Sequence, residues 1–122
     1  MSKFATFCCT ALLLAAVACG SGSSGGSCTS SNATDLASQD QAQIQIHSFA
    51  FQPSCFEATS TQGIKIVNQD QAPHTFTVKG TSVDLKIDAG KTIEQGPLGL
   101  SPGTYPFVCT IHPQMTGTII IK

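Results

Sequence analysis

The sequence predicts an all-β domain folded as a sandwich of two sheets. From Gln43 onward, apolar and polar residues alternate in short stretches, which is typical of strands that bury one face. Glycine and proline residues fall between these stretches and mark turns. No segment after Leu36 keeps a helical period. Several short strands separated by regular turns indicate a β-sandwich.

Six stretches carry this alternation, and valine, isoleucine, threonine and phenylalanine dominate them. In the first stretch, Ile44 and Ile46 are expected to point inward while Gln43, Gln45 and His47 point outward. The predicted strands in chain order are 43–47, 64–67, 76–78, 83–87, 105–108 and 118–121. Turns between them are expected at Gly63, Gly80, Ala89-Gly90, Gly96-Pro97, Gly99 and Pro102-Gly103.

The N-terminus has the pattern of a secretory signal peptide over residues 1–18. Lys3 supplies a positive charge, residues 4–17 are mostly apolar, and Ala16-Val17-Ala18 forms a small-residue cleavage site. The apolar run is too short to span a bilayer comfortably. We therefore expect the domain to be exported, to a bacterial periplasm or the cell surface.

Cys19 directly follows the expected cleavage site and is a candidate lipid anchor. The alternative is an ordinary signal peptide that leaves Cys19 as a free or paired thiol. Residues 20–27 are almost entirely glycine and serine, a composition that behaves as a random coil. We expect a lipid-anchored flexible tether over residues 19–41 and a folded domain over 42–122, which would touch the membrane only through the lipid.

The charge excludes one class of function. The formal net charge is −1, and the chain has neither an arginine nor a basic run. Nucleic-acid binding therefore has no electrostatic support. We expect a monomer.

The most informative motif is Cys109-Thr-Ile-His112-Pro-Gln-Met115, together with Pro73-His74 upstream. One thiolate, two imidazoles and a weak axial thioether are the ligands of blue-copper electron-transfer sites. Structural zinc sites usually take four cysteine or histidine ligands, so zinc fits less well. Alternatively, Cys109 is a buried structural cysteine and His74 a surface histidine. His47 lies outside both motifs and is expected to be an ordinary surface residue.

Both motifs resemble those of the cupredoxins, and the Cys-x2-His-x2-Met spacing is most similar to amicyanin. Plastocyanin and pseudoazurin have longer spacings from histidine to methionine. The stretch from Ile66 to His74 and the last strand, 116–121, also resemble the family. The resemblance covers residues 42–122. It implies a Greek-key β-sandwich of about 7–8 strands holding one type 1 copper ion.

The resemblance also implies roles for single residues. His74, Cys109, His112 and Met115 would be the copper ligands, with Gln114 as the competitor for the axial position. The residues expected to support the ligands are Asn68, Thr75, Thr110 and Pro113. In amicyanin and plastocyanin an asparagine follows the first histidine, and it bonds toward the residue after the cysteine. Thr75 and Thr110 occupy these positions here.

The remaining cysteines suggest a disulfide. Cys8 and Cys9 lie in the expected signal peptide, which leaves Cys28 and Cys55 once Cys19 and Cys109 are assigned. Leftover cysteines of exported proteins often pair. The alternative is two free thiols.

The expected function is a carrier of single electrons between redox proteins, without enzymatic activity of its own. His112 would be the electron port at the exposed end of the sandwich. Partners would dock there transiently on apolar or small residues, with candidates Ala72, Pro73, Leu98, Gly99, Ile111 and Pro113. The alternative function is copper binding or delivery in the periplasm. A copper nitrite reductase or multicopper oxidase would need further copper ions, for which three histidines are too few. A single-copper redox enzyme with an open coordination position is a further alternative.

Overall fold

The computed structural model describes residues 27–122, and the expected signal peptide and Cys19 lie outside this range. The described residues contain ten strands and no helix. Accordingly, no helix in this part of the chain is long and apolar enough to cross a membrane. The strands are β1 (Thr34–Asp35), β2 (Gln41–His47), β3 (Ala50–Gln52), β4 (Cys55–Ala58), β5 (Gly63–Asn68), β6 (His74–Thr77), β7 (Asp84–Ile87), β8 (Thr92–Gln95), β9 (Gly103–Val108) and β10 (Thr116–Ile121).

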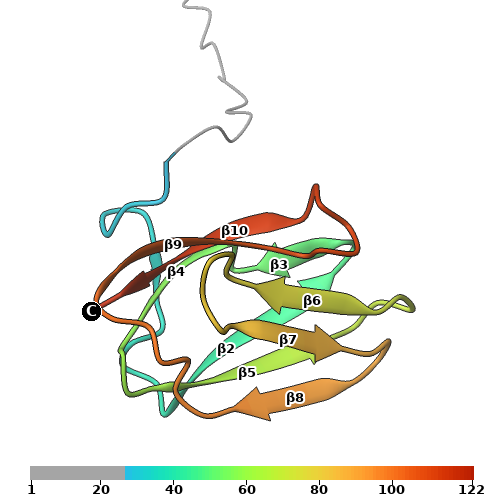
Figure 1. The fold of residues 1–122 in the computed structure, drawn as a ribbon, viewed down its shortest axis with the longest axis horizontal. Coiled ribbons are helices and arrows are strands. Elements are labelled where there is room, and N and C mark those ends of the chain that lie inside the picture. The colour runs from blue at the N-terminus through green and yellow to red at the C-terminus, as the bar shows by residue number, and fades with distance from the viewer. Residues whose placement is uncertain (1–26) are drawn as a thin grey trace, which may run out of the picture.

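The strands form two mixed sheets packed face to face, as Figure 1 shows. One sheet has the order β1-β4-β10-β9-β6-β7 and the other β3-β2-β5-β8. Strand β10 pairs parallel with β4 and antiparallel with β9, while β2 pairs parallel with β5. This architecture confirms the predicted all-β sandwich. The strand count exceeds the expected 7–8 partly because β1 and β3 are only two and three residues long.

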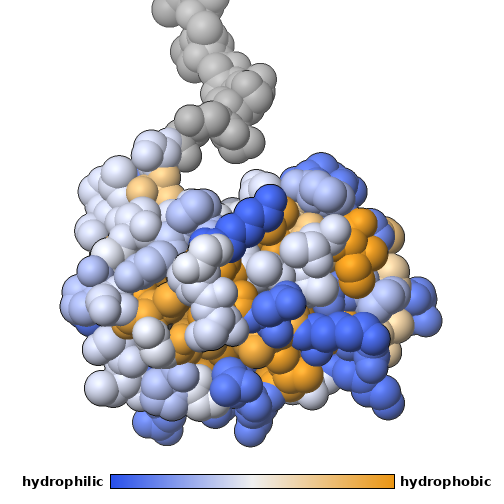
Figure 2. All heavy atoms as spheres, viewed as in Figure 1, coloured by the Kyte–Doolittle hydropathy of each residue, from blue (hydrophilic) through white to orange (hydrophobic). Residues whose placement is uncertain are grey.

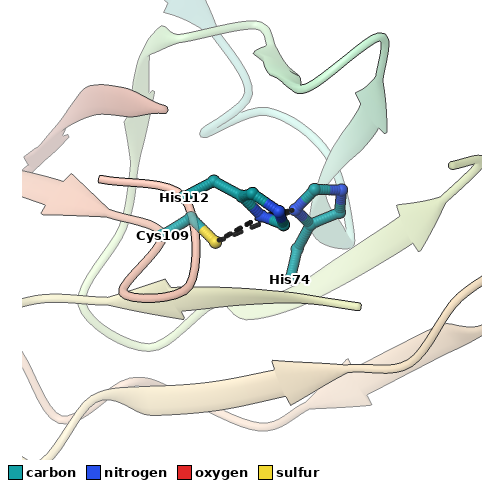
Figure 3. A group of neighbouring side chains, drawn as sticks. All are labelled: His74, Cys109 and His112. Carbon is teal, nitrogen blue, oxygen red and sulfur yellow. Dashed lines mark hydrogen bonds between the residues drawn. The ribbon is translucent and has the colours of Figure 1, made fainter. Parts of the chain in front are cut away.

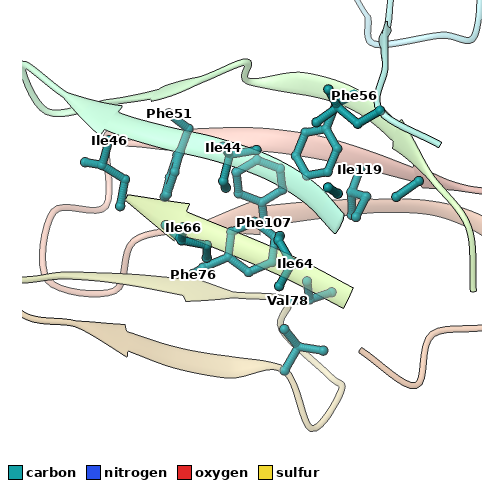
Figure 4. Close-up of a cluster of buried hydrophobic side chains, with 14 of the residues drawn as sticks. Ile44, Ile46, Phe51, Phe56, Ile64, Ile66, Phe76, Val78, Phe107 and Ile119 are labelled. Atoms are coloured by element: carbon teal, nitrogen blue, oxygen red, sulfur yellow. The ribbon is translucent and has the colours of Figure 1, made fainter. Parts of the chain in front are cut away.

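A compact group of aromatic and branched side chains fills the space between the sheets (Figure 4). The ring of Phe107 lies 4.9 Å from Phe51 and 4.5 Å from Phe76, measured between centroids. Ile44, Ile66 and their neighbours on alternate positions are fully buried around these rings. Removing this apolar surface from water is the main stabilising contribution to such a small domain.

Residues 28–41 are folded onto the sandwich, so the expectation that the tether extends to residue 41 is wrong. Cys28 forms a disulfide with Cys55, with the Cα atoms 5.6 Å apart. Leu36 is buried, and its backbone N–H donates to the carbonyl of Glu57. The side-chain amide of Gln62 donates to the carbonyls of Leu36 and Gln39. A covalent bond and these long-range contacts hold a segment whose polar composition alone predicts disorder.

The two ends of the sandwich are formed by different strand ends and loops. Strands β5 and β9 run toward one end, where β6 and β10 begin and where the loop between β9 and β10 lies (Figure 1). We call this the loop end. Leu98 lies at the opposite end, where it lines a small cavity with Ala42, Gly63 and Ile121. The expectation that Leu98 and Gly99 belong to the docking surface is therefore wrong, because β8 carries the chain away from the loop end.

Candidate metal centre

Three candidate ligands converge at the loop end, as Figure 3 shows. His74 is the first residue of β6, while Cys109 directly follows β9 and His112 lies in the loop after it. The thiol sulfur of Cys109 lies 3.8 Å from Nδ1 of His74 and 3.8 Å from Nδ1 of His112. The two Nδ1 atoms are 3.1 Å apart. Three soft or borderline donor atoms therefore form a compact isosceles triangle with its short side between the two imidazoles.

The size of this triangle fits a metal ion. The point equidistant from the three donor atoms lies about 2.1 Å from each of them. For comparison, zinc bonds are about 2.0–2.1 Å long to an imidazole nitrogen and about 2.3 Å long to a thiolate sulfur. Cys109 and His74 are buried, whereas His112 is partly exposed. His74, Cys109 and His112, together with Met115, fit a single type 1 copper ion, the trigonal set with a weak axial thioether.

The loop that carries three of these residues is closed by its own backbone. The N–H of Met115 donates to the carbonyl of His112, and the N–H of Cys109 donates to the carbonyl of Met115. Pro113 occupies the second position of the resulting turn, where its fixed φ is favourable. Met115 is buried while Pro113 is exposed. The loop thus holds Cys109, His112 and Met115 in one tight turn.

A chain of hydroxyl groups links the two motifs. The Thr75 hydroxyl accepts a hydrogen bond from the backbone N–H of Thr110 at 2.8 Å and lies 3.1 Å from the Thr110 hydroxyl. The Thr77 hydroxyl lies 3.0 Å from that of Thr75 and 2.8 Å from a carboxylate oxygen of Asp84. The backbone N–H of Thr75 also points at the Cys109 sulfur, at 3.3 Å. Strand β6 and the loop are therefore fixed to each other beside the thiol.

Asn68 holds the segment before His74. Its side-chain amide donates to the carbonyls of Ala72, Ile87 and Asp88, and its side-chain oxygen accepts from the N–H of Asp70. The side chain is fully buried, so these bonds replace the water that it loses. The loop between β5 and β6 is thereby fixed from the inside.

Asp70 contacts the outer nitrogen of His74. One carboxylate oxygen lies 2.9 Å from Nε2 of His74 and accepts a hydrogen bond from the backbone N–H of Phe49. The other oxygen accepts a hydrogen bond from the backbone N–H of Ser48. Burial raises the pKa of Asp70, but the hydrogen bonds from Phe49, His74 and Ser48 outweigh it and hold the pKa below its ordinary value. Asp70 is therefore a carboxylate at neutral pH.

An aromatic ring covers the two histidines. Ser48 and Phe49 form the two-residue turn between β2 and β3, and both have left-handed backbone angles, with φ of 52° and 58°. Such angles cost about 1–3 kcal/mol for each residue other than glycine. The Phe49 ring stands edge-on to His74 and His112, with centroid distances of 5.4 and 5.0 Å, yet remains 48% exposed.

The structure thus gathers most of the residues singled out by sequence. His74, Cys109, His112 and Met115 lie at the loop end with Asn68, Thr75 and Thr110 around them, whereas His47 is exposed and outside the donor triangle. Sequence reasoning missed Asp70 and Phe49. Asp70 lies four residues before His74, and this short spacing was a weak indication that the carboxylate contacts the histidine. Phe49 offered none, because only the fold brings it to the site.

Comparisons with known proteins give matches to a family and to a fold. The model of the cupredoxin-like domain matches residues 10–121. A comparison with curated proteins gives no match. Among solved structures, a reduced amicyanin variant aligns with a TM-score of 0.57 at 17% identity, covering 67% of this chain and 82% of the amicyanin. A purple cupredoxin from Nitrosopumilus maritimus aligns with a TM-score of 0.57 at 18% identity, covering 67% of this chain and all of that one.

A larger copper enzyme shares the fold. The copper-containing nitrite reductase from Thermus scotoductus SA-01 aligns with a TM-score of 0.57 at 23% identity, covering 67% of this chain and 22% of the reductase. At these identities the likeness concerns the fold alone.

Proposed function

This chain belongs to the cupredoxin-like family, and from that premise we propose that it carries single electrons between redox proteins of the cell envelope. The observation that carries the proposal is the triangle of donor atoms from His74, Cys109 and His112, with sides of 3.1 to 3.8 Å. A copper ion bound there supplies the one-electron couple between Cu(II) and Cu(I).

The surrounding contacts support electron transfer because they restrain the ligands. Asn68 fixes the loop before His74, Thr75 fixes the loop after Cys109, and the turn at Pro113 fixes His112. A site that barely changes shape between two oxidation states loses little energy to reorganisation, so an electron can move quickly. His112 is the only partly exposed member of the donor triangle, which favours it as the electron port.

The loop end also offers a surface for a partner. Two large apolar side chains are well exposed in the described part of the chain, Phe49 at 48% and Ile111 at 45%. Phe49 contacts His112 and Ile111 precedes it in the loop. Figure 2 shows apolar residues reaching the surface at this end, on the right of the view, between hydrophilic neighbours. Such a patch suits brief contacts with other proteins.

We further propose that the protein is exported and tethered to a membrane by a lipid on Cys19. The pattern of residues 1–19 supports this proposal, and the oxidised pair Cys28–Cys55 is consistent with an oxidising compartment. Because residues 28–41 pack onto the sandwich, they would belong to the folded domain and not to the tether.

A visible and EPR spectrum with one equivalent of Cu(II) tests the proposed function. An intense blue or purple thiolate-to-copper band with narrow copper hyperfine splitting is expected. A pale, tetragonal spectrum or binding of Cu(I) alone would contradict electron transfer and favour copper delivery. Tight binding of azide to Cu(II) would instead indicate an open coordination position, as an enzyme requires.

A further inference from the structure

The carboxylate of Asp70 faces three donors from two separate parts of the chain. Its oxygens lie 2.8 Å from the backbone nitrogen of Ser48, 2.9 Å from that of Phe49 and 2.9 Å from Nε2 of His74. The side chain is only 10% exposed. Ser48 and Phe49 form the β2–β3 turn, more than twenty residues before Asp70 in sequence. One anion therefore joins a candidate copper ligand to a distant turn.

The contact with His74 determines what that ring offers to the metal. When Nε2 carries the proton and donates to Asp70, Nδ1 has a free lone pair, and Nδ1 is the atom that faces Cys109 and His112. A carboxylate partner also raises the basicity of a metal-binding imidazole. Because the carboxylate is negatively charged and shielded from water, it favours Cu(II) over Cu(I).

The contact with the turn explains an unusual local sequence. Two-residue hairpin turns with left-handed angles at both positions strongly favour Asn-Gly or a similar pair. Here Ser48 and Phe49 adopt these angles, and the N–H of each residue donates to Asp70. Glycine would adopt the same backbone without strain. What phenylalanine adds is a ring standing edge-on against both His74 and His112.

We propose that Asp70 is a positioning residue that joins His74 and the Ser48–Phe49 turn into one unit at the metal centre. Through this unit, Asp70 sets the tautomer and charge environment of His74, and it holds the Phe49 ring over His112. The ring limits the access of water and small anions to the metal. This inference deepens the proposed electron-transfer function and rests on the same copper site.

Substitutions at Asp70 test whether its negative charge affects the reduction potential of the metal centre. Asp70→Asn keeps the shape but removes the charge, so the reduction potential is expected to rise. A tenfold fall in the ratio of Cu(II) to Cu(I) affinity corresponds to about 59 mV for one electron. The matched control is Asp88→Asn, which removes an exposed carboxylate paired with Lys86 and is expected to change the potential much less. Equal shifts in the two variants would overturn this part.

The copper-free protein tests the positioning part by itself. NMR of wild type is expected to show His74 protonated at Nε2 and slow amide exchange at Ser48 and Phe49. Asp70→Ala is expected to mix the tautomers and speed exchange at both amides at least tenfold. If Asp70→Ala leaves both the His74 tautomer and the exchange of the two amides unchanged, the positioning role of Asp70 is overturned. This readout needs no copper, so it stays decisive even when the spectrum of the loaded wild type contradicts electron transfer.

Phe49→Gly tests the covering ring. Glycine adopts the left-handed angle, so the turn survives, and the affinity of the Cu(II) protein for azide is expected to increase severalfold. The control is Ile111→Ala, which trims the other well-exposed apolar side chain of the described residues and removes no aromatic ring. An azide affinity equal to wild type in Phe49→Gly would overturn the covering role.

Discussion

The hydroxyl of Thr75 is the single contact that most directly fixes the loop after Cys109. The hydroxyl accepts a hydrogen bond from the backbone N–H of Thr110, and the backbone N–H of Thr75 points at the Cys109 sulfur. The family resemblance implies an asparagine at this position. The shorter threonine still reaches the loop, because its hydroxyl oxygen lies 2.8 Å from the Thr110 nitrogen. The Thr77 hydroxyl, which donates to Asp84, lies 3.0 Å from that of Thr75.

Thr75→Val is expected to lower the free energy of unfolding by about 1–3 kcal/mol, because the N–H of Thr110 loses its partner. Thr75→Ser keeps the hydroxyl and is the matched control, expected to stay close to wild type. Denaturant unfolding of the copper-free protein measures both. Equal stability of the valine and serine variants would show that water satisfies the Thr110 amide.

Met115 is the candidate axial ligand, and its replacement tests that role. Met115→Gln is expected to lower the reduction potential and to keep a coloured site, because an oxygen donor stabilises Cu(II) more than a thioether does. Gln114→Ala is the control, since Gln114 is exposed and outside the donor triangle. Voltammetry of the copper proteins gives the answer. An unchanged potential in Met115→Gln would remove Met115 from the ligand set.

Among the strands and loops, the segment before β2 differs most from the structure that its sequence predicts. Residues 28–40 are polar, yet they are held by the Cys28–Cys55 bridge, by Leu36 and by the buried amide of Gln62. The bridge closes a loop with a sequence separation of 27. Its contribution is therefore expected to come mainly from restricting the unfolded chain.

Replacing Cys28 and Cys55 by serine is expected to lower the free energy of unfolding by about 3.5 kcal/mol in the chain-entropy model. The blue spectrum should persist, because neither cysteine belongs to the donor triangle. Denaturant unfolding of the copper-free protein measures the change, and wild type reduced with dithiothreitol serves as a second reference. A double variant as stable as the oxidised wild type would contradict the expectation.

Sequence patterns identified six of the ten strands in the described residues and missed β1, β3, β4 and β8. The six predicted stretches correspond to β2, β5, β6, β7, β9 and β10. Strand β4 lies inside its sheet between β1 and β10, and three of its four residues are buried, so alternation is lost. Strand β8 has one apolar residue, Ile93. Such strands are specified by their neighbours rather than by their own pattern.

The sequence likewise indicated some residues of the metal centre and missed others. Cys109, His112 and Met115 are close in sequence because one tight turn carries them, so their spacing alone indicated the chemistry. Asp70 and Phe49 act through hydrogen bonds and ring contacts that exist only once β2, β3 and β6 are assembled. Long-range contacts of this kind leave no local pattern in the sequence.

Considered as a whole, the molecule concentrates exposed apolar surface at the loop end, beside His112. Ile111→Asp is expected to slow electron self-exchange between copies of the protein several-fold, because two charged loop ends repel. The spectrum and the potential should stay close to wild type. Ser82→Asp adds the same charge beside Leu98, at the opposite end, and should have little effect. NMR line broadening in mixtures of oxidised and reduced protein measures the rate. Equal slowing in both variants would contradict docking through the loop end.

The response of the whole fold to acid is expected to depend on a buried carboxylate in β4. Glu57 lies buried in β4 and pairs with Lys122, next to the end of β10. The hydrogen bond from Lys122 lowers the pKa of Glu57 below its ordinary value of 4.5, and burial only partly opposes this. A carboxyl group with a lowered pKa in the folded state contributes stability above its unfolded pKa. That contribution is lost as the pH falls through the folded pKa.

Copper-free wild type is therefore expected to lose stability below about pH 4.5 more steeply than Glu57→Gln. Asp70, whose pKa is also lowered, titrates in both proteins, so the difference between the two curves isolates Glu57. Denaturant unfolding at a series of pH values from 7 to 3 provides these curves. Parallel curves would mean that Glu57 has the same pKa in the folded and unfolded chain and would contradict the prediction. Converging curves would place the acid sensitivity of the sandwich at the junction of β4 with the end of β10.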